Sequence, residues 1–246
     1  MVYQKGDRMK NTESLVSQIT ARIQNGIISG EIKSGQVIKE RDLEKEYNVS
    51  RTPIKEALKI LESEGWIEIS PRKETKVSTF SASDFEDALE VRLSVETLAL
   101  KLTMQQELTE EEISKIHESI EILDEIAAFP GTLSNDQIDT YNNTDNWFHD
   151  FIYSRSGSKL LQKIHRNLQA FSARTYSVIP IGADRAKEGA MEICRILQGI
   201  LSGQFVTNEI YLKAHITNST MNKIDWLRNA EGNDDEPDQQ GSFSKS

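Results

Sequence analysis

Two histidines and an aspartate in the second half of the chain have the chemistry of metal ligands. Asp145 and His149 are four residues apart, so on a helix they share one face and can point at one centre. His215 lies on the last expected helix. One carboxylate and two imidazoles can hold Zn²⁺ or a similar ion, with water or an acid completing the shell. Hydrogen bonding within a helical bundle, or contact with an effector, is the alternative use of the histidines.

A second group of reactive side chains lies at the start of an expected helix over residues 51–64. Ser50 is expected to cap this helix with its hydroxyl, and Pro53 suits its first turn. Apolar residues recur at the spacing of one buried face, namely Ile54, Ala57, Leu58 and Leu61. Gly65 is expected to end the helix. With the apolar face buried, the exposed side of the first turns carries basic side chains.

The exposed side chains at the beginning of this helix suit DNA, because the major groove admits an α-helix. Arg51 is the best candidate for paired hydrogen bonds to guanine. Arg41, Thr52 and Lys55 suit contacts to phosphates. The alternative is that all of them are ordinary surface groups on a helical domain.

The surrounding pattern predicts a winged helix-turn-helix domain over residues 13–79, after a flexible tail at residues 1–12. Helices are expected at about residues 13–29, 40–47 and 51–64, and strands at 66–69 and 75–78. Asn48 is expected to allow the turn between the second and third helices.

These residues resemble the GntR family of bacterial repressors. The resemblance rests on residues 26–35, 40–43, 49–58, 61 and 64–65. It implies operator contacts by Arg41, Ser50, Arg51, Thr52 and Lys55. Two positions depart from the family: Lys55 replaces the usual arginine, which gives a point charge instead of a fork, and Glu74 replaces the usual wing-tip glycine. A carboxylate there would be repelled by phosphate.

The second half predicts an all-α antiparallel bundle over residues 80–228, so the chain as a whole is expected to be mostly α. Helices are expected at about residues 84–106, 109–128, 135–156, 159–178, 184–202 and 207–227. The first of these carries too many apolar residues for one stripe, and burial on more than one side is expected. Residues 229–246 are polar and acidic, which predicts a disordered tail.

This half resembles the FCD ligand-binding domain of FadR-like GntR regulators at residues 87–96, 145–149, 196–203 and 214–215. The resemblance implies a divalent ion (Zn, Ni or Mn), held by one aspartate and three histidines beside an organic acid. Asp145, His149 and His215 match three ligands, whereas Ile193 occupies the fourth position. Its neighbours Glu192 and Cys194 are about 100° off that face.

Arg92 projects from a largely apolar helix, and a buried guanidinium needs an anionic partner. The FCD resemblance implies that Arg92 faces the effector cavity. An internal pair with Glu96, or with an acid on another helix, is the alternative.

The net charge of −10 is distributed unevenly. Residues 1–80 carry 14 basic and 12 acidic side chains, whereas residues 81–246 carry 15 and 27, so only the first part suits DNA. The single cysteine fits a reducing cytoplasm. No apolar run reaches membrane-spanning length, and the N-terminus lacks the apolar core of a secretory signal.

These features predict a cytoplasmic transcriptional repressor. It is expected to bind a palindromic double-stranded DNA operator as a homodimer and to respond to a small organic acid or sugar acid. A metalloregulator that senses the ion itself is the first alternative. A metal-dependent hydrolase is the second, although no general base or nucleophile motif supports it.

Overall fold

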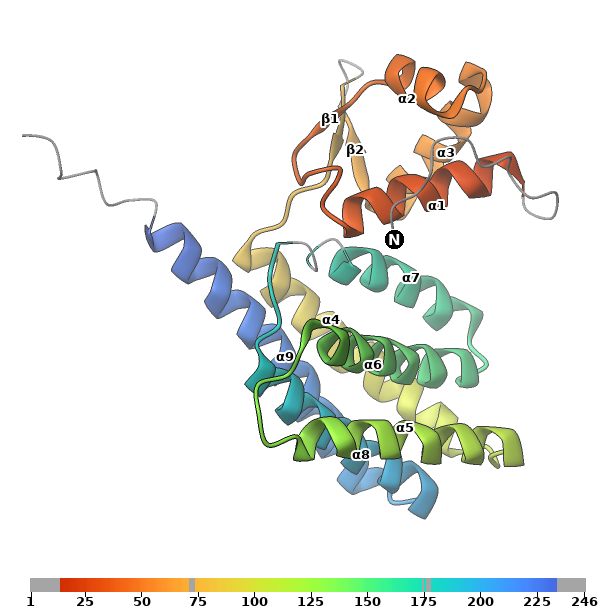
Figure 1. Cartoon of the computed structure of the whole chain (residues 1–246). Helices are drawn as coiled ribbons and strands as arrows, with labels where there is room; N and C mark the ends of the chain where they lie inside the picture. Colours follow the sequence, from red (N-terminus) through yellow and green to blue (C-terminus); the bar gives the residue numbers. More distant parts are fainter. Residues whose placement is uncertain (1–13, 71–73, 174, 176–177, 234–246) are drawn as a thin grey trace, which may run out of the picture. The chain divides into compact units, whose positions relative to one another are not determined.

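The computed structural model describes residues 14–70, 74–173, 175 and 178–233 (Figure 1). The described residues form two compact units, one drawn from residues 14–79 and 163–180 and the other from residues 80–162 and 181–233. The expected tail at residues 1–12 lies outside the described residues. The second expected tail began at residue 229, but α9 (Phe205–Asn233) continues through residues 229–233, so this part of the prediction is wrong. Residues 234–246 lie outside the described part.

The N-terminal unit contains α1 (Leu15–Ile28), α2 (Glu40–Tyr47) and α3 (Arg51–Ser63). Helix α3 packs against both α1 and α2. The predicted apolar face of α3 is buried in the core of this unit, with Ile54, Ala57, Leu58 and Leu61 all 2% exposed or less. Asn48 ends α2 with φ 52°, a left-handed conformation that asparagine tolerates better than most residues, and this turns the chain into α3.

A three-stranded antiparallel sheet completes this unit. Its strands β1 (Val37–Ile38), β2 (Ile67–Ile69) and β3 (Thr75–Val77) lie in the order β1-β3-β2. The sequence predicted β2 and β3 but missed β1, because two residues are too few for an alternating pattern. The winged helix-turn-helix fold is confirmed.

The second unit is all-helical in its described part, as predicted. It contains α4 (Ala82–Met104), α5 (Glu110–Ala128), α6 (Asn135–Arg155), α8 (Ala183–Ser202) and α9. Helix α7 (Lys159–Ala173) begins in this unit, and its later residues group with the N-terminal unit. Reciprocal capping pairs fix three helix starts, namely Ser81 with Asp84, Thr109 with Glu112, and Ser134 with Gln137. The capping by Ser81 starts α4 two residues before the predicted Asp84.

Helix packing brings α4, α6, α8 and α9 around one core. Helix α4 packs against α6 and α9, and α8 packs against α5 and α9 (Figure 1). The α8–α9 approach requires glycine, because a Cβ at Gly199 would lie 1.9 Å from Oδ1 of Asn208. Nδ2 of Asn208 in turn donates to the carbonyl of Ile196 at 3.0 Å. These contacts fix the positions of side chains on the facing sides of α8 and α9.

The expected burial of α4 on more than one side is met only in part. The helix packs against two neighbours, but its apolar residues Val91 and Leu98 are 47% and 45% exposed. The face of α4 that packs on α6 and α9 carries Phe85, Glu96, Ala99, Leu100 and Thr103 instead. Helix α4 therefore has a buried face and a partly apolar exposed face.

In the described part of the chain, no helix combines the length and the apolar character needed to cross a bilayer.

Candidate metal and effector centre

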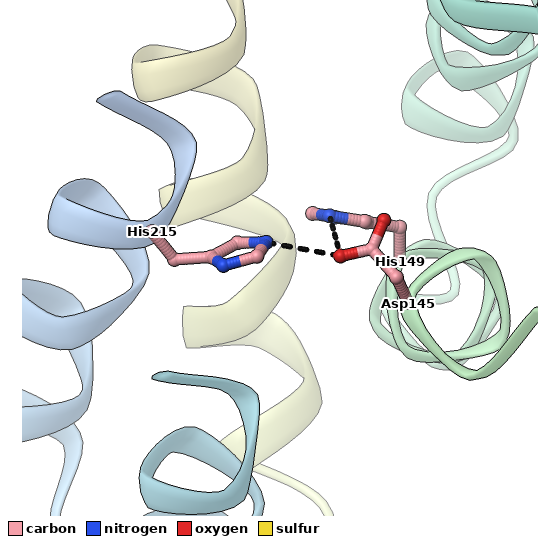
Figure 2. Close-up of side chains that lie close together, drawn as sticks. All are labelled: Asp145, His149 and His215. Atoms are coloured by element: carbon pink, nitrogen blue, oxygen red, sulfur yellow. Dashed lines mark ion pairs between the residues drawn. The ribbon is translucent and has the colours of Figure 1, made fainter. Parts of the chain in front are cut away.

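The side chains of Asp145, His149 and His215 meet in the helical unit. Asp145 and His149 extend from one face of α6, and His215 extends from α9 toward them (Figure 2). Nε2 of His215 lies 3.2 Å from Oδ1 of Asp145, and Nε2 of His149 lies 3.9 Å from the same oxygen. One ligand atom from each residue lies within 4.8 Å of the other two. In a tetrahedral zinc site, neighbouring ligand atoms are about 3.3–3.5 Å apart, so these three side chains could hold a metal ion after small adjustments.

His215 is held from its other side by Glu192 of α8. Nδ1 of His215 lies 2.9 Å from Oε2 of Glu192, and the histidine is only 1% exposed. Arg185 holds Glu192 through two guanidinium N–H groups, and Nδ2 of Asn218 donates to Oε1 of Glu192 at 2.7 Å. Glu192 holds a proton on Nδ1, so loss of the proton that Nε2 donates to Asp145 would leave the lone pair of Nε2 for a metal ion.

His149 is held in a similar way by Glu96 of α4. Nδ1 of His149 lies 2.7 Å from Oε2 of Glu96. The geometry of this close contact is not aligned for a hydrogen bond, so both buried atoms lack an aligned partner within the described residues. Nε of Arg92 donates to the other oxygen of Glu96 at 2.6 Å. Each histidine is therefore contacted at Nδ1 by a glutamate that is itself paired with an arginine.

The charges in this centre favour ionised carboxylates. Burial by itself would raise the pKa of Asp145, but the hydrogen bond from His215 and the nearby positive charges outweigh it and hold that pKa well below its usual range. Burial likewise opposes the hydrogen bonds that His215, Arg185 and Asn218 make to Glu192, and these bonds lower the pKa of Glu192 to about 2. Burial would lower the pKa of His215, but its bonds to Asp145 and Glu192 raise it. Cation binding at Asp145 therefore needs no deprotonation of the carboxylate.

Ile193 is fully buried in the apolar core of the helical unit and provides no ligand atom. Cys194 faces elsewhere, with its sulfur 3.3 Å from Oδ1 of Asp124. Glu192 lies off the metal-facing side, as its helical angle indicated, because it contacts Nδ1 of His215 on the side away from Asp145. Among the described residues, no fourth side chain joins Asp145, His149 and His215 as a candidate metal ligand.

Arg92 and Lys223 place two cations near Asp145. Arg92 pairs with Glu96, which is the alternative partner that its sequence position suggested. Burial, together with the positive charge of Arg92, lowers the pKa of Lys223 to about 8, although Asp145 opposes this shift. Nζ of Lys223 also lies 5.9 Å from the centre of the Phe85 ring. Positive as well as negative side chains therefore lie near Asp145.

A polar pocket of about 540 Å³ opens between α8 and α9. Its lining consists of Arg185, Glu188, Met191, Glu192, Arg195, Asn218, Met221, Asn222 and Asp225. Glu192 lines this pocket and also contacts His215, so the pocket lies behind the histidine and not on the side that faces Asp145.

The expected DNA-contacting side chains are exposed at the beginnings of α2 and α3. They are Arg41, Ser50, Arg51, Thr52 and Lys55. Nε of Arg51 lies 2.5 Å from Oε2 of Glu40, and its side chain remains 64% exposed. Ser50 occupies the N-cap position of α3, but its hydroxyl accepts no capping hydrogen bond, so that expectation is wrong.

The wing residue Glu74 lies 3.2 Å from Nζ of Lys76. This pairing places a positive charge beside the carboxylate that was expected to repel phosphate.

Residues 15–77 match the bacterial regulatory proteins of the gntR family, and residues 87–218 match the FCD domain. The chain belongs to the GntR family, in its FadR-like branch with an FCD domain. This GntR protein is a transcriptional regulator and not an enzyme.

Named relatives of this GntR regulator are repressors and regulators from Bacillus. It is 28% identical over 199 residues to the gluconate operon transcriptional repressor of Bacillus licheniformis, covering 80% of this chain and 74% of that protein. It is 28% identical over 148 residues to the HTH-type transcriptional regulator YdhC of Bacillus subtilis, covering 60% of this chain and 65% of that protein, just under two thirds of its length.

Solved structures share the fold of this GntR regulator. E. coli McbR/YncC aligns with a TM-score of 0.71 at 18% identity, over 89% of this chain and 100% of that chain. A GntR transcriptional regulator from Rhodococcus sp. RHA1 aligns with a TM-score of 0.67 at 16% identity, over 85% and 97%.

Two residues of the centre were missed from the sequence. The helical angle of Glu192 excludes it as a metal ligand, but its long side chain still reaches His215. Lys223 lies two helical turns after His215, and that spacing on one helix was the available signal for it.

Proposed function

We propose that this GntR regulator is a cytoplasmic repressor that binds a palindromic operator as a homodimer and responds to a small sugar acid. Residues 13–79 are proposed to bind DNA, and residues 80–228 to bind the effector. The observation that carries the proposal is the meeting of Asp145, His149 and His215 inside the FCD domain of a chain with a GntR DNA-binding module.

In this proposal α3 enters the major groove. Arg51 reads guanine with its fork of N–H donors, and Ser50 contacts the DNA beside it. Arg41, Thr52 and Lys55 bind phosphates, which fixes the register of the helix. The pairing of Arg51 with Glu40 holds the guanidinium at the N-terminal end of α3 before DNA is bound.

Asp145, His149 and His215 would hold a divalent metal ion. The donor set of one carboxylate and two imidazoles suits Zn²⁺, Ni²⁺ or Mn²⁺. Such an ion supplies a positive charge to which an effector carboxylate can bind. Glu96 and Glu192 orient the two imidazoles, and a small ring rotation of His149 would align its N–H with Glu96.

A sugar acid is the effector class that the centre supports best. Arg92 and Lys223 are close enough for their charges to repel each other, and an anion between them would relieve that repulsion. Two Bacillus relatives, 28% and 26% identical, are gluconate operon repressors. Gluconate is therefore the first compound to test.

A metalloregulator is the second candidate, because three converging ligand atoms favour cation binding whether or not an acid is present. In that case the metal alone would change operator affinity. The two candidates differ in which ligand moves the DNA-binding equilibrium.

The test is operator binding by fluorescence anisotropy, with a duplex first selected from random DNA by the full chain. We expect gluconate or a related sugar acid to weaken operator binding of the metal-loaded protein at least about tenfold. Chelation should abolish this response. If chelation alone changes affinity and no acid does, the metalloregulator replaces the acid sensor. If no duplex is selected, the proposal fails.

A further inference from the structure

The guanidinium of Arg51 is held on one side by two carboxylates of helix α2. Arg51 is the first residue of α3, and its Nε donates to Oε2 of Glu40 at 2.5 Å. Oε1 of Glu44 lies 4.0 Å from the same nitrogen. Glu40 and Glu44 are four residues apart, so they share one face of α2. The side chain proposed to read DNA therefore lies beside two negative charges.

The hydrogen bond to Glu40 uses one particular donor of Arg51. A guanidinium carries N–H donors on Nε and on both Nη1 and Nη2. In the described part of the chain, Nε alone of these nitrogens donates a hydrogen bond. The side chain of Arg51 is still 64% exposed. Both Nη atoms therefore remain available for the O6 and N7 acceptors of a guanine.

The carboxylates beside Arg51 also affect binding to DNA of any sequence. Contacts of arginine and lysine with phosphates are the main source of non-specific affinity. A phosphate that binds Arg51 either comes close to both carboxylates or takes Arg51 away from Glu40. Each event costs free energy, because like charges approach or an ion pair is broken. The edge of a guanine is uncharged, so binding it through Nη1 and Nη2 meets neither cost.

We propose that Glu40 is a specificity-determining residue of this regulator, because it orients Arg51 for guanine and weakens the binding of Arg51 to phosphate. Glu40 acts through Arg51 and is therefore a positioning residue. Glu44 adds a second negative charge on the same side. Glu40 lowers the affinity for DNA of other sequences more than the affinity for the operator, so specificity comes from a repulsive contact. This inference rests on the proposed function, because it needs an operator that Arg51 reads.

Glu40 also has an ordinary structural use. It lies with Asp42 in the first turn of α2, where negative charges favour the positive end of the helix. If that were its whole role, Glu40 would behave like Asp42 in DNA binding. Asp42 is exposed and forms no ion pair among the described residues. It is therefore the matched control, with the same helix, the same turn and the same charge.

The first experiment measures binding of operator and shuffled duplexes by fluorescence anisotropy, with the full chain and its Glu40→Gln and Asp42→Asn variants. The readout is the specificity ratio, which is the dissociation constant for the shuffled duplex divided by that for the selected operator. Glutamine keeps the side-chain length and an acceptor oxygen but removes the charge. We expect Glu40→Gln to bind the shuffled duplex roughly 5–10-fold more tightly and the operator with less than about threefold change. Asp42→Asn should keep the native ratio within about twofold.

The second experiment determines whether Glu40 acts through Arg51. Glu40→Gln is also made in the Arg51→Ala protein, and the four specificity ratios form a double-mutant cycle. Without the guanidinium the carboxylate has nothing to orient, so Glu40→Gln should change the ratio less than about twofold in that background. Thermal melts should show that all variants remain folded, because neither Glu40, Asp42 nor Arg51 is buried.

A ratio that falls with Glu40→Gln, but not with Asp42→Asn and not in the absence of Arg51, supports the positioning role. If the native chain prefers its operator and Glu40→Gln keeps the native ratio, this inference is overturned and the proposed function stands. An equal fall with Asp42→Asn, or an equal fall with and without Arg51, overturns it in the same way. A native chain that binds all duplexes equally overturns the proposed function and this inference together.

Discussion

His149 and His215 lie with their ring centroids 5.6 Å apart and their planes inclined by 32°, although they come from helices α6 and α9. Each ring has a glutamate at Nδ1, Glu96 for one and Glu192 for the other. Both Nε2 atoms are consequently left facing Asp145. The two rings are therefore oriented before any ligand binds.

Glu192→Gln is expected to weaken metal binding. Glutamine keeps the shape of the side chain but removes the charge that fixes the orientation of His215 and raises its basicity. Loss of such a partner costs roughly 10–100-fold in metal affinity. Competition of the protein with a Zn²⁺ indicator measures this directly.

Glu188→Gln is the control for that variant, because Glu188 also pairs with Arg185, at 3.2 Å, and among the described residues it forms no ion pair with either histidine. Equal metal affinity for the Glu192→Gln protein and the native protein would show that Glu192 does not orient the histidine.

Ile193→His is expected to tighten metal binding by supplying a fourth ligand at the position that the FCD resemblance implies. Ile193 is fully buried, so the imidazole also introduces a polar group into the core and should lower the unfolding temperature in the absence of metal. Calorimetric titration with Zn²⁺ gives the affinity. No gain over the native chain would mean that position 193 does not face the centre.

Lys223→Met is expected to reduce the response to a sugar acid while leaving metal affinity nearly unchanged. Methionine preserves the apolar stem and removes the charge that faces Arg92 and Asp145. Lys213→Met is the control, because Lys213 is on the same helix and pairs with Glu209 at the surface. An undiminished acid response of the Lys223 variant would exclude this lysine from effector binding.

Arg51→Ala and Arg41→Ala are expected to weaken DNA binding in different ways. Loss of Arg51 should remove roughly 1–3 kcal/mol of discrimination against the wrong base. Loss of Arg41 should weaken binding to all sequences and reduce the salt slope by about one unit. Anisotropy titrations at several salt concentrations separate the two effects. An unchanged operator footprint for Arg51→Ala would reject its role as a base reader.

Much of the fold could be predicted from the sequence because it depends on local signals. Helical spacing of apolar residues located the buried face of α3, and Asn48 identified the turn before it. Short or nonlocal features were missed. Strand β1 has two residues, and the exposure of Val91 and Leu98 depends on which side of α4 faces α6 and α9.

The candidate site was predictable only in part for the same reason. Asp145 and His149 are four residues apart, so one helix brings them together, and the family resemblance added His215 from a distant helix. Glu192 and Lys223 emerged only from the packing of α8 and α4 against α9. The helical angle of Glu192 placed it off the metal face, but gave no sign that its long side chain reaches Nδ1 of His215 from the other side.

The central claim is that Asp145, His149 and His215 form one metal centre, and anomalous X-ray diffraction at the zinc edge tests it most directly. Crystals of the full chain grown with Zn²⁺ should show an anomalous peak between the carboxylate of Asp145 and the Nε2 atoms of both histidines. Crystals of Asp145→Ala should lack it. A zinc-loaded native crystal with no peak there, or with zinc on the Nδ1 side of either ring, would contradict the claim.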